Sequence, residues 1–209
     1  MLAETLIDRH PQVFHTADAR AWDSIQTHGL LPTAMLRDLV GADFTGARRR
    51  STVYTVPGSD HTVVIRDQQP LKFLNQVLHE DTTEQDFLDI LDGRCFFWAT
   101  EDRLMRIVKG RNYRNTPQVV LSVDTASLVS AYGDIIELSP YNSGDVHVPG
   151  LPRRGRSTFQ LIADYDYDYW ARFRGRSADP VVEVTVPGPI PDILDHISQV
   201  RLFPDDFDV

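Results

Sequence analysis

The sequence predicts an α+β domain. Short strand-like and helix-like segments follow one another without the regular alternation that a doubly wound parallel sheet requires. Apolar residues make up 42% and charged residues 24% of the 209 residues, which is the balance of a globular protein with one sizeable core. No internal repeat or heptad pattern interrupts the chain. We therefore expect one domain over residues 1–209.

In the first half of the chain, capping residues and apolar spacing define the expected elements. Asp18 and Thr82 or Thr83 are typical N-caps, whereas Gly29 and Gly41 stand where left-handed helix ends belong. We expect residues 42–92 to form an insertion of helices and loops. Its first part, residues 42–60, is predicted to be a long surface segment. In order, we expect helix 3–9, a strand ending at His15, an amphipathic helix after Asp18 that is capped at Gly29, helix 32–40, strand 62–66, a helix with apolar positions 71–78, and a helix after Thr82 or Thr83.

The second half begins with an aromatic strand and a well-delimited helix. Thr100 and the acidic residues after it predict the start of that helix, and Gly110 predicts its end. Residues 139–157 are too rich in Pro and Gly for a regular element, which is typical of a ligand-contacting loop. We expect strand 94–100, helix 101–110, strand 118–124, helix 125–132, strand 134–138, strand 158–162, a helical stretch 165–173, strand 181–186 and a strand near 199–203.

Charge and cysteine usage restrict the classes of partner. The formal charge of −9 argues against extensive coating of nucleic acid, because phosphate contacts need cations. Three arginine clusters are either phosphate-binding loops or solvated ones, namely Arg48–Arg50, Arg153–Arg154–Arg156 and Arg172–Arg174–Arg176. A single cysteine, Cys95, excludes an intrachain disulfide and a multi-cysteine zinc site. With no signal-peptide pattern and no membrane-length apolar run, we expect a cytoplasmic protein.

Two polar residues stand where strands are otherwise apolar. His15 ends a strand just before a helix, and it is either a ligand-binding group or a buried ring bonded to backbone. Glu183 lies inside the run Val181–Val186, where an unpaired buried carboxylate costs several kcal/mol unless it has a partner or a function. Exposed on an edge strand, the same residue would have neither.

These segments together resemble the ADP-ribosyltransferase-like superfamily. The opening Val13–Leu31, with a His in a strand and a helix ending in His-Gly-Leu, is similar to the DNA ADP-ribosyltransferase toxins and the RNA 2′-phosphotransferases. The aromatic strand Phe96–Thr100 and the Glu-containing strand Val182–Gly188 resemble the second and third motifs, in the right order. The resemblance implies split, mixed or antiparallel sheets flanked by helices, and an active cleft assembled from three strands.

The resemblance also implies a role for each matching residue. His15, with Thr16 beside it, would bind the ribose or phosphates of NAD, and Phe97 or Trp98 would contact nicotinamide. Glu183 would bond the ribose 2′-hydroxyl and stabilise an oxocarbenium-like transition state. Arg153, Arg154 and Arg156 would reach the same ligand from their loop. NAD is thus the expected substrate, no metal is expected, and DNA or RNA is a candidate acceptor.

The sequence departs from the family pattern at two positions. Thr16 follows His15 directly, and Val181 occupies the place, two before Glu183, where protein-modifying members carry Glu or Gln. A second interpretation is a non-catalytic module that binds nucleic acid or protein through the arginine clusters and the aromatic segment Asp164–Trp170. His15 and His28 as metal ligands, or Asp164–Asp168 as a calcium loop, are weaker interpretations, because further ligands at the required spacing are missing.

Overall fold

One antiparallel sheet organises the protein. The structure, a computed structural model, describes residues 1–44, 47, 50–148, 152–175 and 178–204. Within these residues seven strands pair antiparallel throughout, and a separate hairpin joins β2 (Thr52–Thr55) to β3 (Thr62–Ile65). The predicted α+β class is confirmed. In spatial order the strands are β7 (Gln160–Leu161), β6 (Glu137–Ser139), β8 (Glu183–Pro187), β4 (Arg94–Trp98), β1 (Gln12–Asp18), β5 (Gln118–Asp124) and β9 (Ile197–Phe203).

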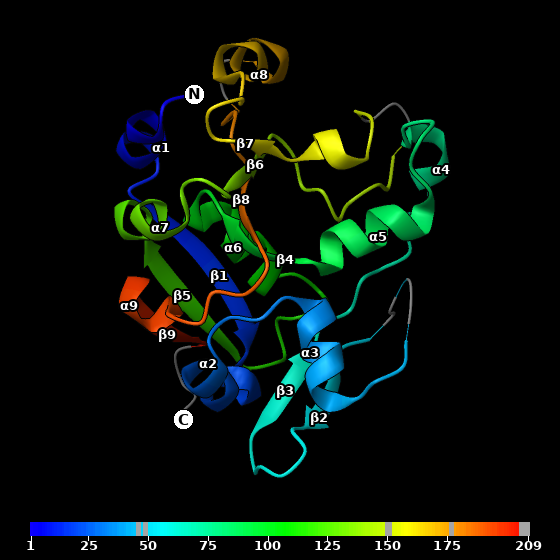
Figure 1. Cartoon of the computed structure of the whole chain (residues 1–209), viewed down its shortest axis with the longest axis vertical. Helices are drawn as coiled ribbons and strands as arrows, with labels where there is room; N and C mark the ends of the chain where they lie inside the picture. The colour runs from blue at the N-terminus through cyan, green and yellow to red at the C-terminus, as the bar shows by residue number, and fades with distance from the viewer. Residues whose placement is uncertain (45–46, 48–49, 149–151, 176–177, 205–209) are drawn as a thin grey trace.

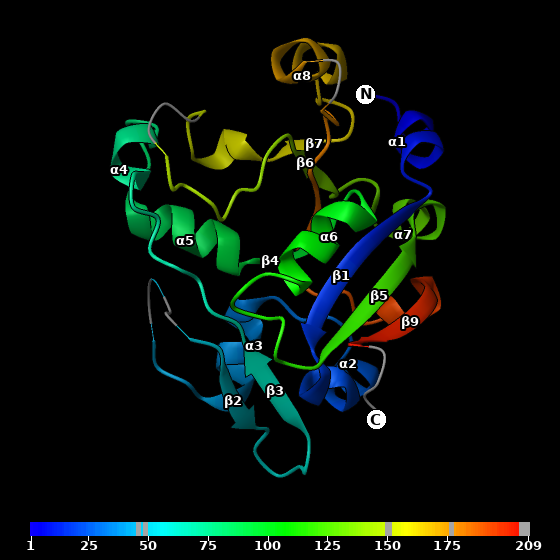
Figure 2. The same cartoon turned by 180° about the vertical axis from the view of Figure 1, so that it is seen from behind.

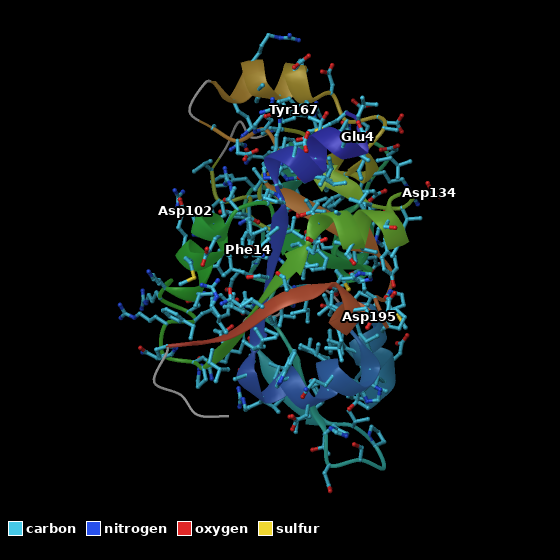
Figure 3. The ribbon with its side chains drawn as sticks, turned by 90° about the vertical axis from the view of Figure 1, so that its left-hand side faces the viewer. Glu4, Phe14, Asp102, Asp134, Tyr167 and Asp195 are labelled. Atoms are coloured by element: carbon cyan, nitrogen blue, oxygen red, sulfur yellow. The ribbon has the colours of Figure 1, made fainter. Side chains whose placement is uncertain are left out.

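Helices cover both faces of this sheet (Figures 1 and 2). One face packs the main core against α1, α2, α7 and α9, through residues such as Leu6, Ile25, Leu128 and Ile193. The other face packs Phe14 and neighbouring apolar residues against α6. Figure 3 shows this layering from the side, with α6 and Asp102 on one side of the strands and Asp134 and Asp195 on the other. The helices are α1 (Ala3–Arg9), η1 (Ala19–Ala21), α2 (Trp22–His28), α3 (Thr33–Val40), α4 (Leu74–Val77), α5 (Glu84–Asp92), α6 (Glu101–Val108), α7 (Thr125–Tyr132), η2 (Arg156–Thr158), α8 (Tyr167–Arg174) and α9 (Ile193–His196).

The expected insertion, residues 42–92, forms two units beside the sheet. The hairpin β2–β3 lies with α2 and α3 at the bottom of Figure 1, and α4 and α5 lie together above α3 at the right. Helices α4 and α5 form a small separate core with Val146 and Phe159, which belong to the long loop between β6 and β7. The sequence predicted β3 and α5, but it missed β2, because three of the four β2 side chains are exposed and leave no alternating pattern.

The pairing of β1 with β4 is interrupted almost where it begins. These strands pair at a single position, Phe14 opposite Trp98, whereas β1 pairs with β5 over seven residues. Beyond this pair the His15 ring bonds the Phe96 carbonyl of β4, at 2.8 Å from Nδ1, in place of a ladder hydrogen bond. The sheet therefore opens between β1 and β4 on one side of Phe14.

Most expected boundaries agree with the structure to within a few residues. Helix α1 and strand β5 have the expected bounds. Asp18 and Thr83 cap their helices with side-chain hydrogen bonds. The strand expected at 158–162 is instead η2 followed by two residues of β7, and the helix expected around 71–78 is regular only over α4. No helix in the part of the chain described here combines the length and the apolar composition needed to span a bilayer.

Gly29 offers a sharp test of how the end of α2 packs against the connection between β8 and α9. It has φ +76°, and an added Cβ would lie 2.4 Å from Pro191 Cα and 2.5 Å from the Ile190 carbonyl oxygen. Since both neighbours are backbone, we expect Gly29→Ala to lower the free energy of unfolding by more than 3 kcal/mol. The control is Gly41→Ala, which has φ +62° with no atom within 4 Å and should cost only about 1 kcal/mol. Urea unfolding measures both, and equal losses would contradict this packing.

Candidate functional site

A cavity of about 350 Å³ lies where β1 and β4 separate. Its wall includes side chains from both faces of the sheet, because the break in the ladder lets the cavity extend between the two strands. Helices α2 and α3, strand β3 and the loop after β6 complete it. The residues of the three motif strands in this wall are His15, Thr16 and Ala17 of β1, Arg94, Cys95, Phe96 and Trp98 of β4, and Glu183 of β8.

Strand alternation alone would separate His15 from Glu183. Glu183 is paired with Trp98, and Trp98 with Phe14, so these three side chains point to one face. His15, one residue after Phe14, points to the other face. Both nevertheless line one cavity, because β1 and β4 diverge directly after the Phe14–Trp98 pair.

His15 is a neutral hydrogen-bond acceptor in this cavity. Its Nδ1 lies 2.8 Å from the Phe96 carbonyl oxygen, which only accepts, so Nδ1 carries the proton. Burial lowers the pKa of His15 to about 4, with a further contribution from Arg66, while the bond to Phe96 acts in the opposite direction. At neutral pH the Nε2 lone pair of this half-buried ring is therefore available to accept a ligand hydroxyl.

The two aromatic candidates on β4 have different roles. Trp98 lines the cavity on the Glu183 face and is half-buried. Phe97 is 1% exposed, belongs to the main core, and contacts the His15 ring edge-on with a centroid distance of 5.9 Å. Of the pair, only Trp98 lines the cavity, whereas Phe97 belongs to the core.

Glu183 is a buried carboxylate whose hydrogen-bond partner is a loop. Its side chain is 4% exposed, and both oxygens accept the Ser143 backbone N–H at 3.2 Å. Among the described residues no Lys, Arg or His forms an ion pair with it. Burial raises the pKa of Glu183 to about 7, although Ser143 and, more weakly, Arg154 and Arg94 act to lower it.

The loop whose Ser143 amide binds Glu183 lies beside the segment after β3. Asn142, Ser143 and Gly144 all line the cavity, and a Cβ on Gly144 would lie 3.5 Å from the Gln68 side-chain oxygen. Gln68 belongs to the segment Arg66–Gln69, which lines the same cavity. The position of the Glu183 carboxylate therefore depends on a loop that the insertion supports.

The arginines of the expected loop, Arg153, Arg154 and Arg156, are not among the residues that line this cavity, so their assignment to the ligand gains no support from it. Arg154 is 1% exposed, lies with its guanidinium 4.0 Å from the Tyr141 ring centroid, and donates to the Pro152 carbonyl at 2.6 Å. Arg153 donates to the Leu78 carbonyl at 2.9 Å, and Arg156 is exposed. Arg153 thus bonds the end of α4, whereas the Arg154 side chain contacts residues of its own loop. Of the other clusters, Arg48, Arg49 and Arg176 lie outside the described residues.

Two other arginines line the cavity, Arg66 and Arg94. Arg94 pairs with Glu137 at 2.5 Å, and its guanidinium lies 3.9 Å from the Phe159 ring centroid. Arg66 donates to the Thr16 carbonyl at 2.7 Å and lies 4.3 Å from the Tyr113 ring centroid. Arg94 could have been found by alternation, because residues 94, 96 and 98 share a face with Glu183. Arg66 and Ser143 carry no such signal, since only the tertiary fold brings their segments here.

A metal site has no support among the residues with described coordinates. No group of three or more His, Cys, Asp or Glu side chains lies close enough there to hold an ion. His28 contacts His61 edge-on, with a centroid distance of 6.3 Å. Burial raises the pKa of Cys95 far above its usual range, which leaves the thiol protonated and unreactive.

Comparison with known proteins places the chain in a family whose function is unknown. No curated protein matches the sequence, and no solved structure matches it either. A family model described as a family of unknown function, DUF7002, matches residues 11–197, which include His15, Trp98 and Glu183. The chain belongs to the DUF7002 family.

Proposed function

We propose that the protein binds NAD in this cavity, breaks the bond between nicotinamide and ribose, and transfers ADP-ribose to a nucleophile. The observation that carries the proposal is that β8, β4 and β1 are consecutive in the sheet and bring Glu183, Trp98 and His15 to one cavity. A His, an aromatic residue and a Glu on three strands around one cleft is also what the resemblance to ADP-ribosyltransferases implies.

Glu183 has the environment that the bond-breaking step needs. When the C1′–N bond breaks, nicotinamide keeps the electron pair and leaves neutral, so positive charge moves to the ribose. The Glu183 carboxylate, buried without an ion-pair partner among the described residues, stabilises that charge more strongly than a solvated carboxylate would. The acceptor then supplies a lone pair to C1′ and releases one proton.

His15 and Trp98 position the substrate. The neutral His15 ring offers Nε2 as an acceptor, which suits a ribose hydroxyl rather than a phosphate oxygen. Trp98 supplies a flat apolar surface in the same wall as Glu183, which suits the nicotinamide ring. The apolar side chains from α2, α3 and β3, including Ile25, Leu36 and Val63, suit the remaining surface of a dinucleotide.

A second candidate function, a non-catalytic binding module, is favoured by the aromatic face of α8. Tyr169 is 46% and Phe173 61% exposed, and their rings stack with a centroid distance of 5.9 Å. Exposed stacked aromatics suit a nucleobase or a protein partner. The absence of any NAD cleavage with protein, DNA and RNA acceptors would favour this function over the transferase.

The first test removes the charge of Glu183 and keeps its shape. We expect Glu183→Gln to slow nicotinamide release by about 10² or more with little change in NAD affinity, because the lost interaction acts mainly in the transition state. The same variant should melt at a higher temperature than the wild type at pH 8, since it removes a buried charge. An equally active variant would exclude Glu183 from the reaction.

The pH dependence gives a second test. With a pKa of about 7, Glu183 is protonated below neutrality and cannot stabilise positive charge. We expect nicotinamide release to rise about tenfold per pH unit up to pH 7 and then level off. Since folding raises this pKa from 4.5, stability should fall as pH rises between 4.5 and 7, an effect that Glu183→Gln abolishes. A rate that falls with pH over this range would contradict the assignment.

Neighbouring substitutions on β4 give a third test, with each variant as the control of the other. We expect Trp98→Leu to weaken NAD binding about tenfold, because Trp98 lines the cavity. Phe97→Leu should leave NAD affinity nearly unchanged and lower the free energy of unfolding by about 1 kcal/mol, because Phe97 lies in the core. Calorimetric titration with NAD and urea unfolding separate the effects. Weaker NAD binding in Phe97→Leu and unchanged binding in Trp98→Leu would contradict the register of β4.

A further inference from the structure

A second cavity, of about 470 Å³, shares a wall with the first. Arg66, Asp67, Gln69 and Tyr113 line both cavities. The rest of the second wall comes from the start of η1, the residues before β2, and the loop between α6 and β5. The two cavities are thus neighbours, with the segment Arg66–Gln69 in the wall between them.

The second cavity has the charge of an anion site. Arg20, Arg50 and Arg66 line it against two aspartates, Asp18 and Asp67, in a chain of net charge −9. The loop that contributes Asn112 and Tyr113 to the wall also carries the exposed Lys109, Arg111 and Arg114. The lining thus has one more positive than negative side chain, and further cations lie in the same segment as two of its residues.

Donors of the protein already occupy both carboxylates. Asp18 accepts the Arg20 side chain at 2.8 and 2.7 Å and the Arg20 backbone N–H at 3.0 Å. Asp67 accepts the Tyr113 hydroxyl at 2.5 Å and the Ser51 hydroxyl at 3.2 Å. The Arg20 side chain nevertheless stays 57% exposed, and Arg50 is exposed at the cavity. An entering anion would therefore meet arginine donors that remain accessible to it.

We propose that this cavity is the acceptor subsite and that it binds a phosphate group of a nucleotide-containing acceptor. The inference rests on the proposed function, because it assigns a place to the molecule that receives ADP-ribose. Arg20 and Arg50 bind the phosphate, and the side chains of Asn112 and Thr116 bond the adjoining sugar or base. The segment Arg66–Gln69 lies between the two sites, and its Gln68 side chain lies near Gly144, the residue after the Ser143 whose amide binds Glu183.

The test measures binding of cytidine 5′-monophosphate, cytidine and the dinucleotide CpC by calorimetric titration. We expect the two phosphate-bearing probes to bind and cytidine to bind at least tenfold more weakly. A stronger signal for cytidine monophosphate indicates an acceptor with a terminal phosphate, and a stronger signal for CpC indicates a nucleic-acid chain. Arg50→Gln and Arg20→Gln should each lower the affinity for the phosphate-bearing probe about tenfold and reduce the salt dependence of its binding.

Arg172→Gln is the matched control, because it removes the same charge from an exposed residue of α8 that lines neither cavity. It should leave the affinity unchanged. Arg50→Gln should also leave NAD affinity unchanged, since Arg50 lines only the second cavity. In Glu183→Gln protein, saturating NAD should not displace the probe.

Three results would overturn the proposal: equal binding of cytidine and its monophosphate, equal losses in Arg50→Gln and Arg172→Gln, or displacement of the probe by NAD. The last result would assign the second cavity to the phosphates of NAD itself. Arginine-dependent probe binding in a protein that neither binds nor cleaves NAD would keep the phosphate site and reject the transferase function.

Discussion

The single residue pair at which β1 and β4 meet is the constraint on which the candidate site depends. A continuous ladder between these strands would place His15 and Glu183 on opposite faces of a closed sheet, because neighbouring side chains alternate. The ladder ends after Phe14 and Trp98, and the His15 ring bonds the Phe96 carbonyl that the missing pairing would otherwise leave without a donor. The opening of the sheet and the fixed orientation of His15 thus have one cause.

Glu183 shows how the surrounding structure maintains a costly group. Residues 183–186 of β8 are all buried and Glu183 is 4% exposed, so its carboxylate has lost most of its hydration. The compensation is one backbone amide, that of Ser143, rather than a cation. Such an arrangement stabilises the fold less than an apolar side chain would, and it leaves the charge available to a ligand. The raised pKa follows from the same burial.

The insertion between α3 and β4 is part of the site rather than an appendage. Strand β3 and the segment Arg66–Gln69 line the first cavity, and that segment also lines the second. Helices α4 and α5 have a separate core, which packs Val146 and Phe159 of the long loop. That loop carries Ser143, so the packing of the insertion bears on the position of the Glu183 carboxylate.

The sequence by itself determined the fold class, most helices and strands, and the polar residues that stand out against apolar strands. Caps and helix-ending glycines act locally, which is why Asp18 and Gly41 could be assigned from the sequence and the cap of α5 narrowed to Thr82 or Thr83, of which the structure shows Thr83. Only the tertiary structure decided that Trp98 rather than Phe97 lines the cavity, because strand register depends on the partner strand. It also decided that Arg66 and Arg94 line the cavity while Arg153, Arg154 and Arg156 do not, since contacts between distant segments leave no local pattern.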